Sequence, residues 1–259
     1  MHLKILRLIL AALTVIISGG CLYSQTSFIG VQRSNAKIDE IFNRREEGLK
    51  KELEEKRISW PPRSLYIRAF KHNQLVEIWI KGGAQNNYRL FKTDTICMQI
   101  GNTGPKRKQG DLQIPEGFYF IDEFNPNSNY HLSLGLNYPN TSDLIICDSL
   151  HPGTDPGGDI FIHGNCVSVG CLAINDSPIE ELYILSVYAK SNGQDFIPVH
   201  VFPVKYDEDE SIEYLDKVTK EDISLRKFEF KLKEAFDYFE EKKSLPIILV
   251  NKNGEYIIE

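Results

Sequence analysis

Short stretches of alternating apolar and polar residues recur along 65–136, and this pattern constrains the possible folds more than any other feature of the chain. Val76, Ile78 and Ile80, for example, alternate with Glu77 and Trp79, which is the period of a strand with two distinct faces. Clusters of glycine, proline and asparagine separate the stretches. Strands are expected at 65–70, 75–80, 88–92, 96–100, 117–121 and 131–136. Because no helical pattern interrupts them, a mostly antiparallel sheet or sandwich is predicted.

Helical patterns lie on both sides of this β-rich region. Residues 36–57 and 225–239 each carry an apolar stripe at helical spacing. Ser177 followed by Glu180 is a helix-start signature, so a helix is expected over 178–189 with Ser177 as its N-cap. Further strands are expected at 159–163 and 196–204, with a closing hairpin at 246–258. The predicted fold class is α+β, mostly β: a mixed-sheet or sandwich core with flanking N- and C-terminal helices.

The composition excludes several classes of protein. Hydrophobic residues make up 42% of the 259 residues and charged residues 25%, which is ordinary for a globular chain and unlike a disordered, coiled-coil or multi-span membrane protein. The chain has 36 acidic and 30 basic residues, so its formal net charge is −6. An acidic balance argues against nucleic-acid binding, which needs a basic surface.

Residues 1–24 have the pattern of a secretory signal. Lys4 and Arg7 give a basic start, an apolar run follows over 5–17, and small residues come next. The run is shorter than the roughly 20 residues of a membrane-spanning helix. Cleavage before Cys21 would allow lipidation and membrane anchoring, whereas cleavage after Ser24 would release the chain. Either outcome predicts a location in the periplasm or cell envelope.

Export changes the interpretation of the cysteines. Apart from Cys21, the chain has an even set of four: Cys97, Cys147, Cys166 and Cys171. In an oxidising compartment the simplest interpretation is two disulfides, with the pairing open. The alternative is that one cysteine remains a thiol because it carries out chemistry.

Residues 162–173 hold the best candidates for that chemistry. A cysteine nucleophile needs a nearby base, because a free thiol is mostly protonated at neutral pH. His163 at the end of a predicted strand is a suitable base for Cys171, and Gly170 allows a close approach just before the cysteine. The sequence therefore favours a cysteine–histidine site.

Three alternatives stay open at this point. His163, Cys166 and Cys171 would form a zinc site if joined by Asp155, Asp159 or His151, although the spacing is not that of a standard zinc knuckle. Cys166 and Cys171 would otherwise form a local disulfide, and His163 would then be a buried structural histidine.

The same segment resembles the signature of the YkuD-type L,D-transpeptidase catalytic domain. It is most similar to the YafK-like branch, in which the signature is Ile-His-Gly-x-x-x-Ser-x-Gly-Cys, here residues 162–171. A second element, Gly-Asp-x-Gln-x-Pro-Glu-Gly-x-Tyr at 110–119, is also similar to that family. With smaller matches at 104–106, 130–133 and 138–140, the resemblance covers about 61–256.

The resemblance implies roles for the site residues. Cys171 would be the nucleophile and His163 the base, Ser168 would stabilise the loop or orient the site, and the backbone N–H groups of Gly170 and Cys171 would form the oxyanion hole. Val169 departs from the commoner pattern because it replaces a second histidine.

The arginine that often follows the family's cysteine is also missing, since Leu172 and Ala173 stand there. Recognition of a substrate carboxylate would then fall to Lys106, Arg107 or Lys108, for which a solvated basic turn is the simpler interpretation. Four other residues near the motif are further candidates for the site: His131, Tyr138, Asp143 and Asp159. A structural role is preferred for His131.

The function implied by the resemblance is acyl transfer on peptidoglycan stem peptides through a thioacyl intermediate on Cys171. Hydrolysis of a stem-peptide link, a silent wall-binding module with Cys171 blocked in a disulfide, and a zinc hydrolase are the alternatives. No metal or organic cofactor, no nucleic acid and a monomeric state are expected. The predicted organisation is a signal peptide at 1–24, a helical extension at 25–60, a catalytic domain at 61–205, and a C-terminal helix and hairpin at 206–259.

Overall fold

The computed structural model describes residues 27–83 and 85–259, so the predicted signal at 1–24 lies outside the described residues. The centre of the fold is a sheet of eight strands in the order β3-β2-β1-β8-β4-β5-β6-β7. The strands are β1 (Pro62–Phe70), β2 (Leu75–Gly82), β3 (Arg89–Thr95), β4 (Gly117–Asn125), β5 (Ser133–Leu136), β6 (Phe161–His163), β7 (Leu172–Ala173) and β8 (Ile197–Phe202). The pairs β1–β8 and β6–β7 are parallel and the others antiparallel, so the sheet is mixed.

The segment that follows β3 connects the two ends of this sheet. Met98 forms an isolated bridge with Ala173 on β7, and the Cys97 N–H donates to the Ala173 carbonyl at 2.9 Å. The sheet is therefore curled, with the chain leaving one edge strand to contact the other. The predicted strand at 96–100 is wrong, because this crossing segment meets a partner at one bridge and has no continuous ladder.

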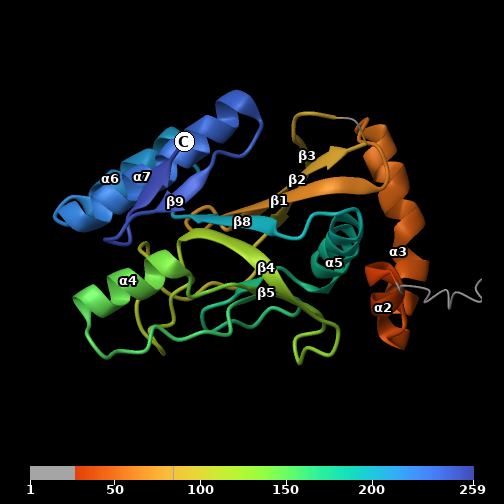
Figure 1. Cartoon of the computed structure of the whole chain (residues 1–259), viewed down its shortest axis with the longest axis horizontal. Helices are drawn as coiled ribbons and strands as arrows, with labels where there is room; N and C mark the ends of the chain where they lie inside the picture. Colours follow the sequence, from red (N-terminus) through yellow and green to blue (C-terminus); the bar gives the residue numbers. More distant parts are fainter. Residues whose placement is uncertain (1–26, 84) are drawn as a thin grey trace, which may run out of the picture.

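Helices cover the sheet on both faces (Figure 1). On one side lie α2 (Phe28–Arg33), α3 (Ala36–Glu55) and α5 (Asp176–Ser191), and α5 contacts β1, α2 and α3. On the other side lie α6 (Asp209–Thr219), α7 (Ile223–Lys242) and a hairpin of β9 (Ile248–Val250) and β10 (Tyr256–Ile258). The remaining helix, α4 (Thr141–Leu150), lies beside this hairpin, where the Ser142 hydroxyl donates to the Gly254 carbonyl at 2.5 Å.

Strand β1 shows why both faces need a cover. Leu65 and Ile67 join the core that includes α3 and α5, whereas Tyr66 and Phe70 point to the opposite face. There the rings of Tyr66 and Phe239 lie 4.8 Å apart. Because successive side chains of a strand point to opposite faces, a strand such as β1, whose side chains are buried at every position from Leu65 to Phe70, must be covered on both.

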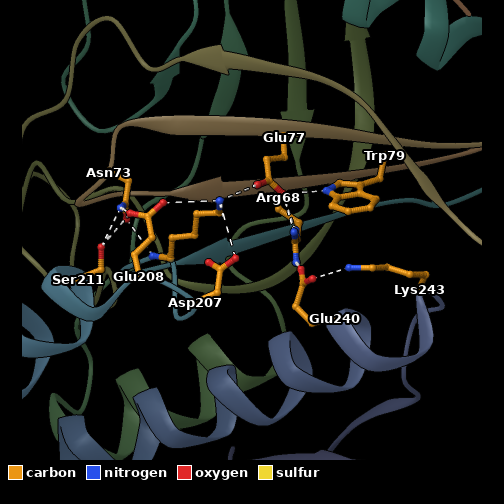
Figure 2. Close-up of polar contacts among 10 residues, drawn as sticks. Arg68, Asn73, Glu77, Trp79, Asp207, Glu208, Ser211, Glu240 and Lys243 are labelled. Carbon is orange, nitrogen blue, oxygen red and sulfur yellow. Dashed lines mark hydrogen bonds and ion pairs between the residues drawn. The ribbon is translucent and has the colours of Figure 1, made fainter. Parts of the chain in front are cut away.

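Arg68, on the α7 side of β1, is the centre of a buried polar network (Figure 2). Its guanidinium donates through Nε to Glu77 at 2.9 Å and through Nη1 to Glu240 of α7 at 2.7 Å. The Trp79 indole N–H also donates to Glu77, at 2.8 Å. The buried cation thus has two carboxylate partners, as a charge removed from water requires, and it joins the sheet to α7.

The predicted fold class is confirmed, as are the helices near 36–57 and 225–239 and the closing hairpin. The predicted start of the third helix is wrong. Asn175 is the N-cap of α5 and Ser177 lies inside its first turn, because the Glu180 carboxylate binds Arg44 and Arg45 of α3 instead of closing a capping box.

Three helices, α2, α4 and α6, were not predicted. None of the helices within the described ranges has the length and apolar character needed to cross a bilayer. The predicted domain boundaries stay predictions.

Candidate active site

Two neighbouring parallel strands bring the predicted site residues together. The register of β6 and β7 pairs His163 with Ala173 and Ile162 with Leu172. Ile162 and Leu172 are fully buried in the main core. Because side chains alternate between faces, His163 and Cys171 point to the opposite face. There they line one cleft of about 330 Å³.

The walls of this cleft come from the end of β4 with the β4–β5 connection, and from the start of β6 with the segment before it. Asn125, Asn127 and Tyr130 line one side, and Asp159 and Phe161 line another. The rings of Tyr130 and His163 lie 4.7 Å apart and are tilted by 32°.

The N-terminal helix α3 holds the loop that carries Tyr130. The Lys37 ammonium donates to the His131 carbonyl at 2.6 Å, and the amide of Asn35, the N-cap of α3, donates to Asn127 at 3.3 Å. The wall opposite the nucleophile is therefore fixed from outside the sheet.

His163 is buried, and its tautomer can be assigned from its neighbours. Its Nδ1 lies 2.6 Å from the Gly164 carbonyl oxygen. A carbonyl only accepts hydrogen bonds, so Nδ1 carries the proton and Nε2 is left with its basic lone pair. Burial lowers the pKa of His163, and the bond to the Gly164 carbonyl opposes that effect. The imidazole is therefore neutral near pH 7 and able to accept a proton at Nε2.

Cys171 is a free, half-buried thiol. Its S–H donates to the Asp159 carbonyl, with 3.6 Å between the heavy atoms. Burial raises the pKa of the Cys171 thiol, and the Asp159 carboxylate raises it further, whereas the Phe161 N–H and the Lys106 ammonium favour the thiolate. The resting pair is therefore a thiol and a neutral imidazole, and the proton must move to His163 when sulfur attacks.

Ser168 orders the turn that presents Cys171. Its Oγ accepts from the Cys171 N–H at 2.9 Å and the Gly170 N–H at 3.2 Å, and it donates to the Cys171 carbonyl at 2.7 Å. A stabilising role for Ser168 in this turn stays a prediction. The same bonds occupy the two amides expected to form the oxyanion hole, so the structure does not offer them to a substrate and we do not assign the hole to them.

Glycine is required on both sides of this turn. Gly170 has a φ of +130°, which residues with a side chain rarely adopt. A Cβ at Gly164 would lie 2.7 Å from an Asp176 carboxylate oxygen and 2.9 Å from the Tyr130 carbonyl. Steric constraints therefore explain both glycines of the motif, Gly164 after His163 and Gly170 before Cys171.

One disulfide joins Cys97 to Cys166, with 5.7 Å between the Cα atoms. It ties the catalytic turn to the segment that bridges the sheet edges. Cys147 is a buried thiol, so the expected second disulfide does not form between the two remaining cysteines, and the alternative pair Cys166–Cys171 is wrong. Cys166 is also unavailable to the zinc site considered above. In residues 27–83 and 85–259, no group of three or more histidine, cysteine or acidic residues is arranged to hold a metal.

Of the three candidate carboxylate-binding residues, Lys106 and Arg107 are already paired, whereas Lys108 is exposed and forms no ion pair within the described residues. The Lys106 ammonium lies 2.6 Å from Asp111, and the Arg107 guanidinium lies 3.1 Å from Asp143. Asp143 also caps α4, and burial raises its pKa to about 6 against the opposing effect of Arg107. These residues support the fold beside the cleft.

Of the four further candidates near the motif, some support the fold and one lines the cleft. Tyr138 donates to the Pro156 carbonyl at 3.0 Å and lies in the core. His131 binds Glu180 at 2.8 Å behind the Tyr130 loop, which agrees with a structural role. Asp159 alone among the four lines the cleft.

Sequence reasoning missed the side chains of the β4–β5 connection as cleft residues. The signal was the polar run Asn-Pro-Asn-Ser-Asn at 125–129 between two predicted strands, since functional side chains often lie in such loops. Its position against His163 depends on the fold.

No protein-family model matches the chain. Among solved structures it is similar to the helical cell shape determining protein Pgp2 of Campylobacter jejuni, with 17% identity, a TM-score of 0.42 and 73% of each chain covered. It is also similar to Bd1075 of Bdellovibrio bacteriovorus, with 18% identity, a TM-score of 0.36, and 74% of this chain and 78% of that one covered.

Sequence similarity is stronger. The chain is 30% identical over 196 residues to the protein named "Putative L,D-transpeptidase YafK" from Escherichia coli strain K12 and, equally, to its counterpart from Escherichia coli O157:H7, covering 75% of this chain and 73% of each relative. The chain therefore belongs to the YafK family of L,D-transpeptidase homologues.

Proposed function

We propose that this protein is an exported cysteine acyltransferase that acts on peptidoglycan stem peptides through a thioacyl intermediate on Cys171. The observation that carries the proposal is a free Cys171 thiol in one cleft with a neutral His163 whose Nε2 is unprotonated. Membership of the YafK family supports the substrate class.

The chemistry follows from these protonation states. His163 Nε2 takes the thiol proton as Cys171 sulfur attacks the peptide carbonyl carbon, and an imidazolium forms beside a tetrahedral oxyanion. Collapse breaks the C–N bond, and the imidazolium returns the proton to the leaving amine, which leaves a thioester. An amine or water then attacks the thioester with His163 again accepting its proton, and the thiol is released. The Gly164 carbonyl stabilises the imidazolium as a triad's third member does.

The state of the cysteines supports this proposal over a silent wall-binding module and also bears on export. That alternative requires Cys171 to be blocked in a disulfide, whereas the bond joins Cys97 and Cys166 and leaves the Cys171 thiol free. A structural disulfide is also typical of exported proteins, which supports secretion directed by residues 1–24.

The test is product analysis by mass spectrometry with defined tetrapeptide muropeptides, with and without an amine acceptor. The wild type should release the terminal residue, and Cys171→Ala and His163→Ala should abolish release. Cys147→Ala, which removes the buried thiol outside the cleft, is the matched control and should retain activity. Turnover by Cys171→Ala would contradict the proposal, and the acceptor arm distinguishes transfer from hydrolysis.

A further inference from the structure

The described lining of the cleft around Cys171 contains a single formally charged side chain. Apart from His163 and Cys171, its lining consists of asparagine, serine, tyrosine, phenylalanine and valine side chains, and one acid, Asp159. His163 is neutral near pH 7 because burial lowers its pKa. Within residues 27–83 and 85–259 no lysine or arginine lines the cleft, so the formal charge of its described lining is that of Asp159.

Asp159 is held against the nucleophile by its backbone. It has a φ of +56°, and its carbonyl accepts the Cys171 S–H at 3.6 Å. Its side chain is exposed, and its carboxylate has no ion-pair partner among residues 27–83 and 85–259. Of the cations at 106–108, Lys106 pairs with Asp111 and Arg107 with Asp143, and among the described residues no ion pair joins the exposed Lys108 to Asp159.

This carboxylate works against the nucleophile. Its negative charge raises the pKa of the Cys171 thiol and so disfavours the thiolate. A neutral amide at this position would leave a more reactive sulfur. An acid at this position is therefore useful for the reaction if its charge binds a group of the substrate.

We propose that Asp159 is a specificity-determining residue that binds a primary ammonium group of the substrate close to the scissile or newly formed amide. This inference rests on the proposed acyl transfer and defines its substrate class. The unpaired carboxylate attracts a cation into an otherwise uncharged cleft and disfavours a substrate carboxylate there. The ammonium belongs to the acyl donor or to the acceptor, and the two cases differ experimentally.

The test compares Asp159→Asn with wild type on matched peptides that carry a free or an acetylated side-chain amine. One pair places the amine on the acyl donor and a second pair places it on the acceptor. Asparagine tolerates a left-handed backbone as well as aspartate does, so the variant should fold. Asp148→Asn, an exposed residue on α4 outside the cleft, removes the same charge as a control.

The free-amine peptide of one pair should show a KM about tenfold higher in Asp159→Asn than in wild type, which is the range of a partly exposed charged hydrogen bond. The KM for the acetylated peptide should not change. Asp148→Asn should behave as wild type, and Asp159→Glu should restore part of the preference for the free amine. In Asp159→Asn, the pH profile of Cys171 alkylation should shift to lower pH, because the negative charge that disfavours the thiolate is gone.

An unchanged preference for the free amine in Asp159→Asn, with both pairs, would overturn the proposal. Calorimetric binding of the same peptides to Cys171→Ala, and to that variant with Asp159→Asn added, separates this failure from failure of the proposed function. Amine-dependent binding without any turnover by wild type refutes the function alone, and turnover without amine-dependent binding refutes the role of Asp159 alone.

Discussion

Replacing Ser168 with alanine removes one oxygen atom that makes three hydrogen bonds in the catalytic turn. The Oγ accepts from the N–H groups of Gly170 and Cys171 and donates to the Cys171 carbonyl. Ser168 is 8% exposed and Gly170 is buried, so water has little access to replace the lost partner. At about 1 kcal/mol for each bond, the loss should be roughly 2–3 kcal/mol of unfolding free energy.

Thermal unfolding followed by circular dichroism measures this loss. For a domain of this size, 1 kcal/mol corresponds to about 2–4 °C, so the Tm of Ser168→Ala should fall by roughly 5–10 °C. Ser168→Thr keeps the hydroxyl and should lose much less. Alkylation of Cys171, followed in a Cys147→Ala background, should also lose its wild-type pH profile because the turn is no longer fixed. A Tm within about 2 °C of wild type, together with an unchanged alkylation profile, would refute this reasoning.

Three further outcomes are expected. Gly170→Ala, at a φ of +130°, should cost about 1–3 kcal/mol and reduce turnover, whereas Gly158→Ala, with open space around its Cβ position, should be neutral in both assays. Burial lowers the pKa of His200 to about 3, so the unfolded chain binds this proton first, and His200 should contribute a loss of roughly 2.5 kcal/mol of unfolding free energy between pH 7 and pH 4.5. Urea unfolding measures it as the change, over this pH range, in the difference between wild type and His200→Gln, because groups such as Asp143 titrate in both proteins. Removing the Cys97–Cys166 disulfide, which closes a separation of 69 residues, should lower the unfolding free energy by about 4 kcal/mol in the loop-entropy account, measured by the same urea titration.

Local patterns predicted the parts of the fold that depend on local physics. The alternation around Ile78 predicted β2, since a strand buried on both faces still carries a period of two. Residues 96–100 had similar apolar content but cross from one sheet edge to the other, and sequence does not show whether a partner strand lies alongside. The α4 helix had a local signal that was not used, the capping box of Asn140 and Asp143.

The candidate site likewise combines residues that a local pattern identifies with residues that only the fold brings together. His163 and Cys171 were identifiable because their chemistry and spacing lie within one short segment, and the parallel pairing of β6 and β7 explains why they share a cleft. The wall at Tyr130 and the disulfide partner Cys97 come from distant segments, so only the fold brings them to the site. The occupied amides near Ser168 show that a motif assigns residue types more securely than hydrogen-bond partners.

In the proposed reaction Cys171 forms a thioester with the substrate and His163 accepts and returns the proton. Intact-mass analysis of wild-type protein, quenched in acid after brief mixing with a stem tetrapeptide, tests it directly. The mass of the protein should rise by the mass of the tetrapeptide minus that of the released terminal amino acid, which is the tripeptide less one water. This adduct should map to Cys171, be removed by hydroxylamine, be retained in Cys147→Ala and be missing from Cys171→Ala. Product formation with no such adduct on Cys171, or an adduct of the same mass in Cys171→Ala, would contradict a thioester on Cys171.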